Sequence, residues 1–119
     1  MKIVNIPKNT ILYHGSSREP SLIGPTFFTP IVTMAMKYGD NLHTYVTTDS
    51  INNIIKSSNP DDIVEFLGGD PENQTPGECL ELMEDMYRTD NDPINGFWIT
   101  RNEKDEEICL VDTSKLKKM

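Results

Sequence analysis

The chain has 119 residues, of which 36% are hydrophobic and 25% charged, with a formal net charge of −8 at pH 7. These values are typical of one soluble globular domain, which we expect to span residues 1–119, and they exclude a disordered chain. No apolar run reaches the roughly 20 residues of a membrane-spanning helix, and the N-terminus does not resemble a secretory signal. We therefore expect a cytoplasmic protein without a membrane partner.

The acidic balance limits the partners that the protein can bind. Non-specific binding to the phosphates of nucleic acids needs clustered lysine and arginine, which argues against a nucleic-acid partner. A basic protein surface is a better complement, and the acidic residues concentrate after position 60. Cys79 and Cys109 lack paired metal-ligand spacing, so we expect two reduced, buried thiols and no metal site.

The first part of the chain predicts three short strands and one helix. Residues 2–6 and 10–14 are apolar enough for strands, and the second of these ends at a glycine. A loop rich in proline and glycine precedes a short strand at 26–29. The Thr-Pro pair that follows is typical of a helix start, and this helix is predicted to end at Gly39.

The rest of the chain predicts two helices enclosed by strands. One helix is predicted to begin at Asn59 and to end near Gly68, and the next begins at Thr75, which forms a capping box with Glu78. The remaining predicted strands are 42–48, 96–100 and 106–112, the last two joined by a hairpin loop at 101–105. Strands at both ends with helices between them indicate an α+β domain.

Three separate segments carry side chains that are suited to chemistry. His14 stands at a strand end, where a histidine is more often structural than catalytic. The glycine after it lets a ligand approach the backbone, and Ser16 adds a hydroxyl. Phe27 and Phe28 are neighbours on a strand, so their side chains point to opposite faces, and one of the two is expected in the core.

The third segment is the last predicted strand, which is rich in acids. Alternation places Glu106 on one face with Ile108, and Glu107 on the other face with Cys109. Glu107 and Glu106 are thus candidates on opposite faces of the strand, and a register that differs by one residue would exchange them.

Three segments follow one another along the chain: Tyr13-His14-Gly15-Ser16, Phe27-Phe28-Thr29 with Tyr38, and Glu107 through Asp112. In this order they resemble the ADP-ribosyltransferases of the histidine type, the family of diphtheria toxin and the poly-ADP-ribose polymerases. The resemblance implies a compact α+β fold in which two small, mostly antiparallel sheets surround an NAD cleft, with flanking helices. It requires that the three segments meet in one cleft. Phe28 stands where the family most often has tyrosine; it can stack on a ring but cannot donate a hydrogen bond.

The resemblance also implies roles for individual residues. His14 and Glu107 would be catalytic, with His14 holding ribose hydroxyls and Glu107 stabilising the positive charge that develops on the ribose. Residues implied to bind NAD are His14, Gly15, Ser16, Phe28, Thr29 and Tyr38. NAD would be a substrate, and the chemistry requires no metal. Asp105 occupies the position where arginine-specific members have glutamate or glutamine, so the acceptor residue stays open.

The activity implied is transfer of a single ADP-ribose unit from NAD to a macromolecule, with a protein favoured over nucleic acid. Small cytoplasmic enzymes of this kind are similar to phage or viral effectors that act on host machinery or host defence. Two alternatives stay open. One is a non-catalytic acidic binding or inhibitor protein with the same fold, and the other is an NAD glycohydrolase.

Overall fold

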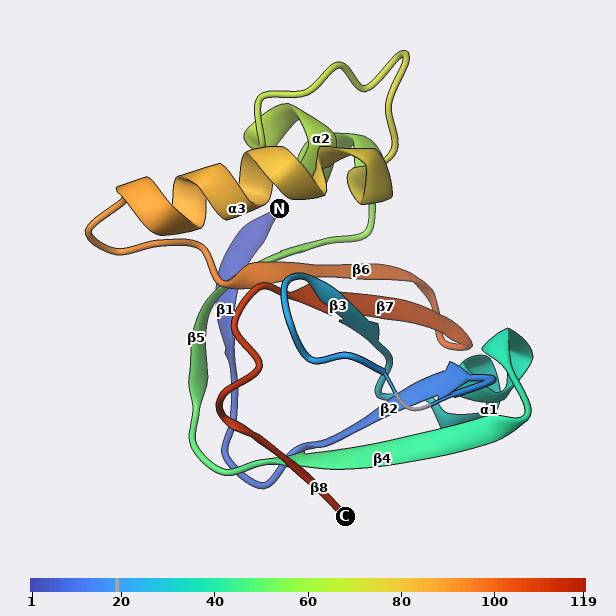
Figure 1. The fold of residues 1–119 in the computed structure, drawn as a ribbon. Helices are drawn as coiled ribbons and strands as arrows, with labels where there is room; N and C mark the ends of the chain where they lie inside the picture. Colours follow the sequence, from blue (N-terminus) through green and yellow to red (C-terminus); the bar gives the residue numbers. More distant parts are fainter. Residues whose placement is uncertain (19) are drawn as a thin grey trace.

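The computed structural model describes residues 1–18 and 20–119, in which two sheets and a helical layer are stacked (Figure 1). The larger sheet has five strands, in the order β1 (Lys2–Ile6), β5 (Ile51–Ser57), β6 (Gly96–Asn102), β7 (Asp105–Leu110) and β3 (Thr26–Phe28). The smaller sheet has three, in the order β2 (Ile11–Ser16), β4 (Asn41–Thr47) and β8 (Leu116–Lys118). Apart from the parallel pair β5–β6, the paired strands are antiparallel, so the expected α+β fold with two small, mostly antiparallel sheets is confirmed.

The two longer α-helices cover the outer face of the five-stranded sheet, and the three-stranded sheet, with the shortest α-helix beside it, lies across the other face (Figure 1). The α-helices are α1 (Val32–Ala35), α2 (Pro60–Phe66) and α3 (Leu80–Thr89), with short 3₁₀ helices at Met36–Tyr38 and Pro76–Cys79. In the part of the chain that the structure describes, no helix is long and apolar enough to cross a membrane.

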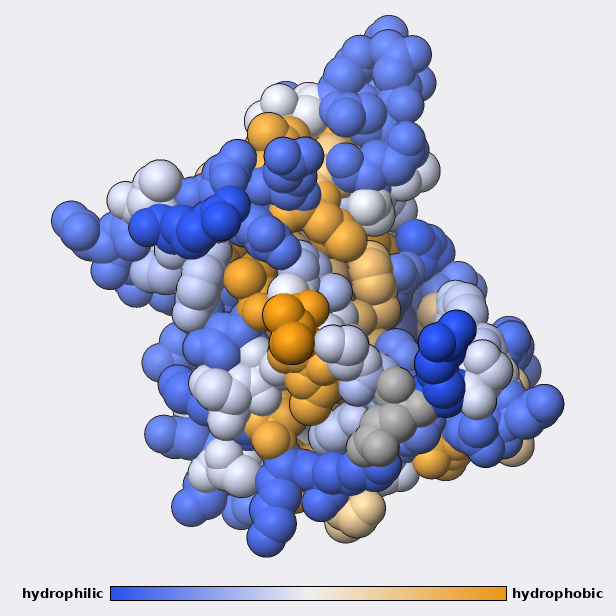
Figure 2. Space-filling model, viewed as in Figure 1, coloured by the Kyte–Doolittle hydropathy of each residue, from blue (hydrophilic) through white to orange (hydrophobic). Residues whose placement is uncertain are grey.

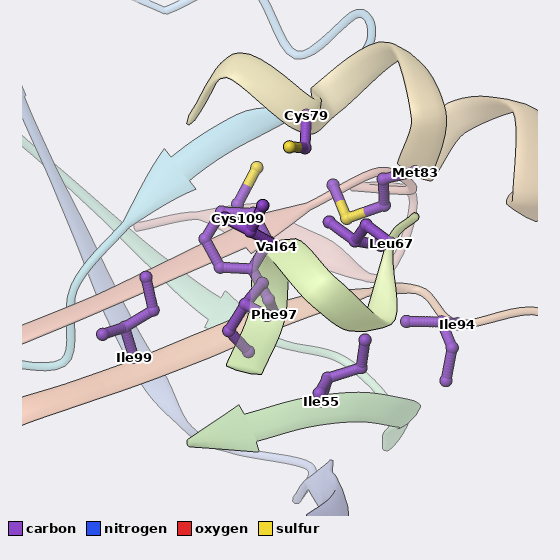
Figure 3. Packing of buried hydrophobic residues seen from close by; sticks show 10 residues of the cluster. Ile55, Val64, Leu67, Cys79, Met83, Ile94, Phe97, Ile99 and Cys109 are labelled. Carbon is purple, nitrogen blue, oxygen red and sulfur yellow. The ribbon is translucent and has the colours of Figure 1, made fainter. Parts of the chain in front are cut away.

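Two hydrophobic clusters hold these layers together. Between α2, α3 and the five-stranded sheet, the buried residues are Ile55, Ile63, Val64, Leu67, Cys79, Met83, Ile94, Phe97, Ile99 and Cys109 (Figure 3). Between the two sheets they are Ile6, Leu12, Phe28, Tyr45, Ile51, Ile54, Ile108 and Leu110. Burying one such large side chain contributes about 1.5–3 kcal/mol, so alternate residues of the central strands fix both layers at once.

Of the two longer helices, α2 begins where the sequence predicts, whereas α3 begins only at Leu80, because the segment that starts at Thr75 first forms the 3₁₀ helix Pro76–Cys79. Asn59 accepts a hydrogen bond on its side chain from the backbone N–H of Asp61, at 3.0 Å, and caps α2. Thr75 and Glu78 form the predicted capping box before α3. Both cysteines are buried free thiols in the cluster below these helices, as expected.

Elsewhere the elements differ from the prediction. The predicted helix after Thr29 begins only at Val32, and the Thr29 hydroxyl accepts a hydrogen bond from the N–H of Ile31 at 3.1 Å instead of capping a helix. The sequence pattern predicts neither β5 nor β8. Strands β6 and β7 extend into the segment predicted as a loop, so that only Glu103 and Lys104 form the turn between them.

Candidate functional site

A pocket of about 310 Å³ opens where the two sheets part. Its lining comes from three strands and the 3₁₀ helix after α1: Tyr13, His14, Gly15, Phe27, Phe28, Tyr38 and Glu107. The volume is at the lower end of the ~300–1,000 Å³ typical of small-molecule sites. The three segments singled out in the sequence therefore meet in one pocket.

The strand β3 creates this pocket by leaving one sheet for the other. Phe28 is its last residue paired with β7, opposite Ile108. The next residue, Thr29, instead exchanges two backbone hydrogen bonds of 2.9 Å with Tyr13 of β2. Beyond this point no described residue pairs with β7 on that edge, and Glu107 stands where the gap opens.

Gly15 and Gly39 bring the segment that carries Tyr38 against β2. A Cβ atom on Gly15 would lie 1.6 Å from the carbonyl oxygen of Ala35, and one on Gly39 would lie 2.3 Å from the backbone of Ser16. No side chain fits at either position without moving the backbone. Gly15 thus serves the packing of α1 as well as lining the pocket.

A hydrogen bond to a backbone carbonyl group orients the ring of His14. Its Nδ1 atom lies 2.6 Å from the carbonyl oxygen of Phe27. Because a carbonyl oxygen only accepts, Nδ1 must donate, and Nε2 of the neutral ring remains an acceptor for a hydroxyl. The ring also packs edge-on to Phe28 at 6.0 Å and lies 6.3 Å from the ring of His43.

The two phenylalanines of β3 have different surroundings. Phe28 is 2% exposed, belongs to the core between the sheets and packs edge-on against Tyr45, with ring centroids 5.6 Å apart. Phe27 is only partly buried, packs against Phe97 and points to the same face of the sheet as Glu107. Both line the pocket, and Phe27 is the more exposed of the two.

Glu107, and not its neighbour, lines the pocket. Glu106 points to the opposite face of β7, where its Oε1 accepts a hydrogen bond of 2.9 Å from Trp98 Nε1. Glu107 Oε2 lies 3.2 Å from Nη1 of Arg101, and the Glu107 side chain is 27% exposed. The two acids therefore lie on opposite faces of the strand, as alternation predicts, and Glu107 is the one on the side of the pocket.

Cys109, two residues after Glu107, is buried on the same face of β7. Burial, and to a smaller extent the Glu107 charge, raises the pKa of this thiol far above its usual range. It stays protonated at neutral pH and is no nucleophile.

Two residues implied to bind NAD lie outside the pocket lining. The Ser16 hydroxyl donates to the carbonyl oxygen of Arg18, and Thr29 is 4% exposed in the turn before α1. Their assignment rests on the resemblance alone. Tyr38, by contrast, lines the pocket and is 64% exposed.

Three residues at the site have no role assigned to them in the sequence prediction. Tyr13 and Phe27 line the pocket, and Arg101 contacts Glu107 from the β6–β7 hairpin. Tyr13 and Phe27 directly precede two candidates, which is the only signal that could have pointed to them.

Comparison with known proteins gives a likeness of fold. No protein family model matches the chain, and no curated protein matches it. The fold is similar to that of a crystal structure of an anti-CRISPR protein, with a TM-score of 0.50 and 13% sequence identity over 94% of this chain and 96% of the other.

Proposed function

We propose that this protein is a mono-ADP-ribosyltransferase that takes NAD as its substrate and modifies a protein. One observation carries the proposal: an imidazole, a carboxylate and several aromatic rings from three distant segments line the same pocket. This lining is mostly aromatic, and among the described residues it includes no lysine or arginine. Such a site favours a flat, positively charged ring over an anion, because aromatic faces and a carboxylate both attract cations. The nicotinamide end of NAD fits that description.

The proposed reaction breaks the bond between nicotinamide and C1′ of the ribose. The bonding electron pair leaves with nicotinamide, and positive charge develops on the ribose, as in glycoside cleavage. Glu107 holds the ribose 2′-hydroxyl and stabilises that charge, while His14 Nε2 accepts a hydrogen bond from a ribose hydroxyl. The aromatic walls orient the leaving ring. A nucleophile of the acceptor then bonds to C1′ and loses its proton to solvent. If these residues have these roles, the α+β fold of this chain is of the ADP-ribosyltransferase type.

The surface supports a protein as the acceptor. Residues 60–92 hold eleven acidic residues and a single basic one, and the rest of the chain carries ten basic and eight acidic residues. The negative charge thus gathers in the helical layer, where Figure 2 shows hydrophilic side chains along α3 and the loop before it. Exposed apolar side chains lie in the segment that brings Tyr38 to the pocket, namely Val32, Met36, Tyr38 and Leu42. A basic partner with an apolar contact area complements both features.

The likeness to an anti-CRISPR protein supports a place for this activity in conflict between a phage or virus and its host. We extend the proposal accordingly: the modified protein belongs to a host defence system, and the reaction takes place in the host cytoplasm.

A second candidate is a binding or inhibitor protein with this fold and no catalysis. Arg101 favours it, because its guanidinium already pairs with the Glu107 carboxylate. Phe28 also favours it, since its ring is nearly inaccessible to a ligand.

The deciding experiment uses NAD labelled in its ADP-ribose part, incubated with the purified protein and either host lysate or isolated CRISPR effector proteins. We expect a labelled protein band that Glu107→Gln reduces at least about 100-fold, since removing one electrostatic stabiliser of a transition state typically costs this much. The matched control is Glu106→Gln, one residue away on the opposite face, which should retain nearly full activity.

The other outcomes separate the alternatives. Nicotinamide release without a labelled band would identify an NAD glycohydrolase. No turnover together with no thermal stabilisation by NAD would overturn the proposal in favour of the binding protein, since a ligand that binds the folded state raises its melting temperature.

A further inference from the structure

We propose that Arg101 is a positioning residue for Glu107: a bulge in β6 places its guanidinium between two carboxylates of β7 and thereby fixes the acid of the pocket. This inference rests on the proposed function, because it concerns how Glu107 performs its role.

The bulge is visible in the pairing of the hairpin. Thr100 lies opposite Glu106, but the next pair joins Asn102 to Asp105. Arg101 is therefore the extra residue on β6. Bulges of this kind redirect a side chain, and they are common beside active sites. Here the side chain is directed toward Asp105 and Glu107, which share one face of β7 because they are two residues apart.

One nitrogen atom contacts both acids. Arg101 Nη1 lies 3.2 Å from Oε2 of Glu107 and 3.4 Å from Oδ1 of Asp105. Arg101 is not part of the pocket lining, so the guanidinium approaches the carboxylate from the hairpin and not from the pocket. Oε2 is engaged on that side, and Oε1 remains available for a hydroxyl of the ligand.

The contribution of these contacts to stability is small. The side chains of Arg101, Asp105 and Glu107 are 37%, 38% and 27% exposed. Ion pairs at such exposure contribute little to the free energy of unfolding. Their larger effect is on orientation, since a glutamate has three rotatable side-chain bonds and a bridged guanidinium restricts them. An acid held in place before the ligand binds needs no reorganisation during the reaction.

The same contacts admit a contrary role, in which Arg101 masks Glu107 and must move away before catalysis. The two roles predict opposite results on removal of the guanidinium. A positioning residue raises kcat, so its loss lowers kcat, whereas a masking residue lowers activity, so its loss increases turnover. Asp105 favours positioning, because its carboxylate contacts the same nitrogen atom of Arg101 and so holds the guanidinium beside Glu107.

The test compares kcat and KM for nicotinamide release from NAD in the full chain. We expect Arg101→Gln to lower kcat between about 10- and 100-fold, the cost typical of a displaced catalytic group, with KM for NAD changed less than twofold. Arg101→Lys should lower kcat less than Arg101→Gln does, because lysine keeps the positive charge but lacks the planar guanidinium group. Arg88→Gln is the matched control: Arg88 forms an exposed pair with Asp85 at 2.8 Å on α3 and should leave kcat unchanged.

A double variant separates this inference from the proposed function. In the Glu107→Gln background, Arg101→Gln should have no further effect, because a positioning residue acts only through the group that it positions. If Glu107→Gln is inactive but Arg101→Gln matches the wild type or exceeds it, the positioning role is wrong and the proposed function survives. If Glu107→Gln retains full activity, or the wild type never releases nicotinamide, the proposed function fails and this inference fails with it.

Discussion

Phe27 and Phe28 are adjacent in sequence and both line the pocket, yet Phe28 is buried and Phe27 is only partly buried. Phe28 packs between His14 and Tyr45 at 2% exposure, so it forms the floor of the pocket. Phe27 shares its side of the sheet with Glu107 and is partly accessible. The stacking role implied for Phe28 by the resemblance is therefore better suited to Phe27, with Tyr38 as the second ring.

Alanine substitution should distinguish these two phenylalanines. We expect Phe28→Ala to lower the free energy of unfolding by about 3–5 kcal/mol, because it removes a buried ring from the core between the sheets. Phe27→Ala should cost less stability but weaken NAD binding more, because it removes a wall of the pocket. Urea unfolding and thermal stabilisation by NAD measure the two effects. Equal losses of stability with unchanged NAD binding in Phe27→Ala would contradict this division.

For single residues, the sequence predicts on which face of a strand some side chains lie, but not all of them. Alternation along the last strand correctly separates Glu107 from Glu106, because the buried Ile108 and Cys109 point to different cores. It cannot rank Phe27 against Phe28, since the answer depends on where β3 leaves β7 for β2. It also gives no sign of Arg101, whose position follows from a bulge that exists only once two strands have paired.

Among the elements, α3 is linked to the end of β7 by a hydrogen-bonded carboxylate. Asp112 accepts a hydrogen bond of 2.9 Å from the backbone N–H of Ser114 and another of 3.2 Å from the Tyr87 hydroxyl. The bonds from Ser114 are the main cause that holds the pKa of Asp112 below its usual range, with Tyr87 contributing less. Burial and the nearby Asp112 raise the pKa of Tyr87.

This lowered pKa predicts how stability depends on pH. The ionised Asp112 is favoured in the folded state, so its contribution is present at neutral pH and is lost as pH falls through the lowered pKa. We expect Asp112→Asn to cost about 1 kcal/mol at pH 7, after allowance for solvent exposure. The difference from wild type should shrink in acid. Urea unfolding between pH 7 and pH 3 measures it, with the exposed Asp40→Asn as control; a constant difference across that range would refute the assignment.

The elements that sequence patterns identify are those with local signals. Caps at Asn59 and Thr75 act within a few residues, and they locate α2 and the start of the helical segment before α3. The sequence pattern does not predict strand β5, because Asn52 and Asn53 interrupt its apolar residues. Asn53 also has a φ of 62°, which few strand residues adopt. The strand exists because β1 and β6 pair with it on both edges, which is information that no local window contains.

In the molecule as a whole, the pocket and the acidic surface belong to different layers. The parting of the two sheets forms the pocket, and the helical layer on the outer face of the larger sheet carries the acidic excess. Under the proposed function, the helical layer would attract a basic target protein, while NAD would bind separately in the pocket. Charges on a rim mainly accelerate encounter, and salt weakens their effect.

This separation predicts that target recognition can be impaired without affecting the chemistry. Glu65, Glu72 and Glu81 are exposed on α2, the following loop and α3. We expect replacing all three by glutamine to slow modification of the labelled target about tenfold at low salt, because steering depends on charge, and to leave nicotinamide release without target unchanged. Asp40→Asn, Asp49→Asn and Glu103→Gln together remove the same charge outside the helical layer and should have little effect. If both triple variants slow modification equally, net charge alone is responsible, and the helical layer is not the surface that meets the target.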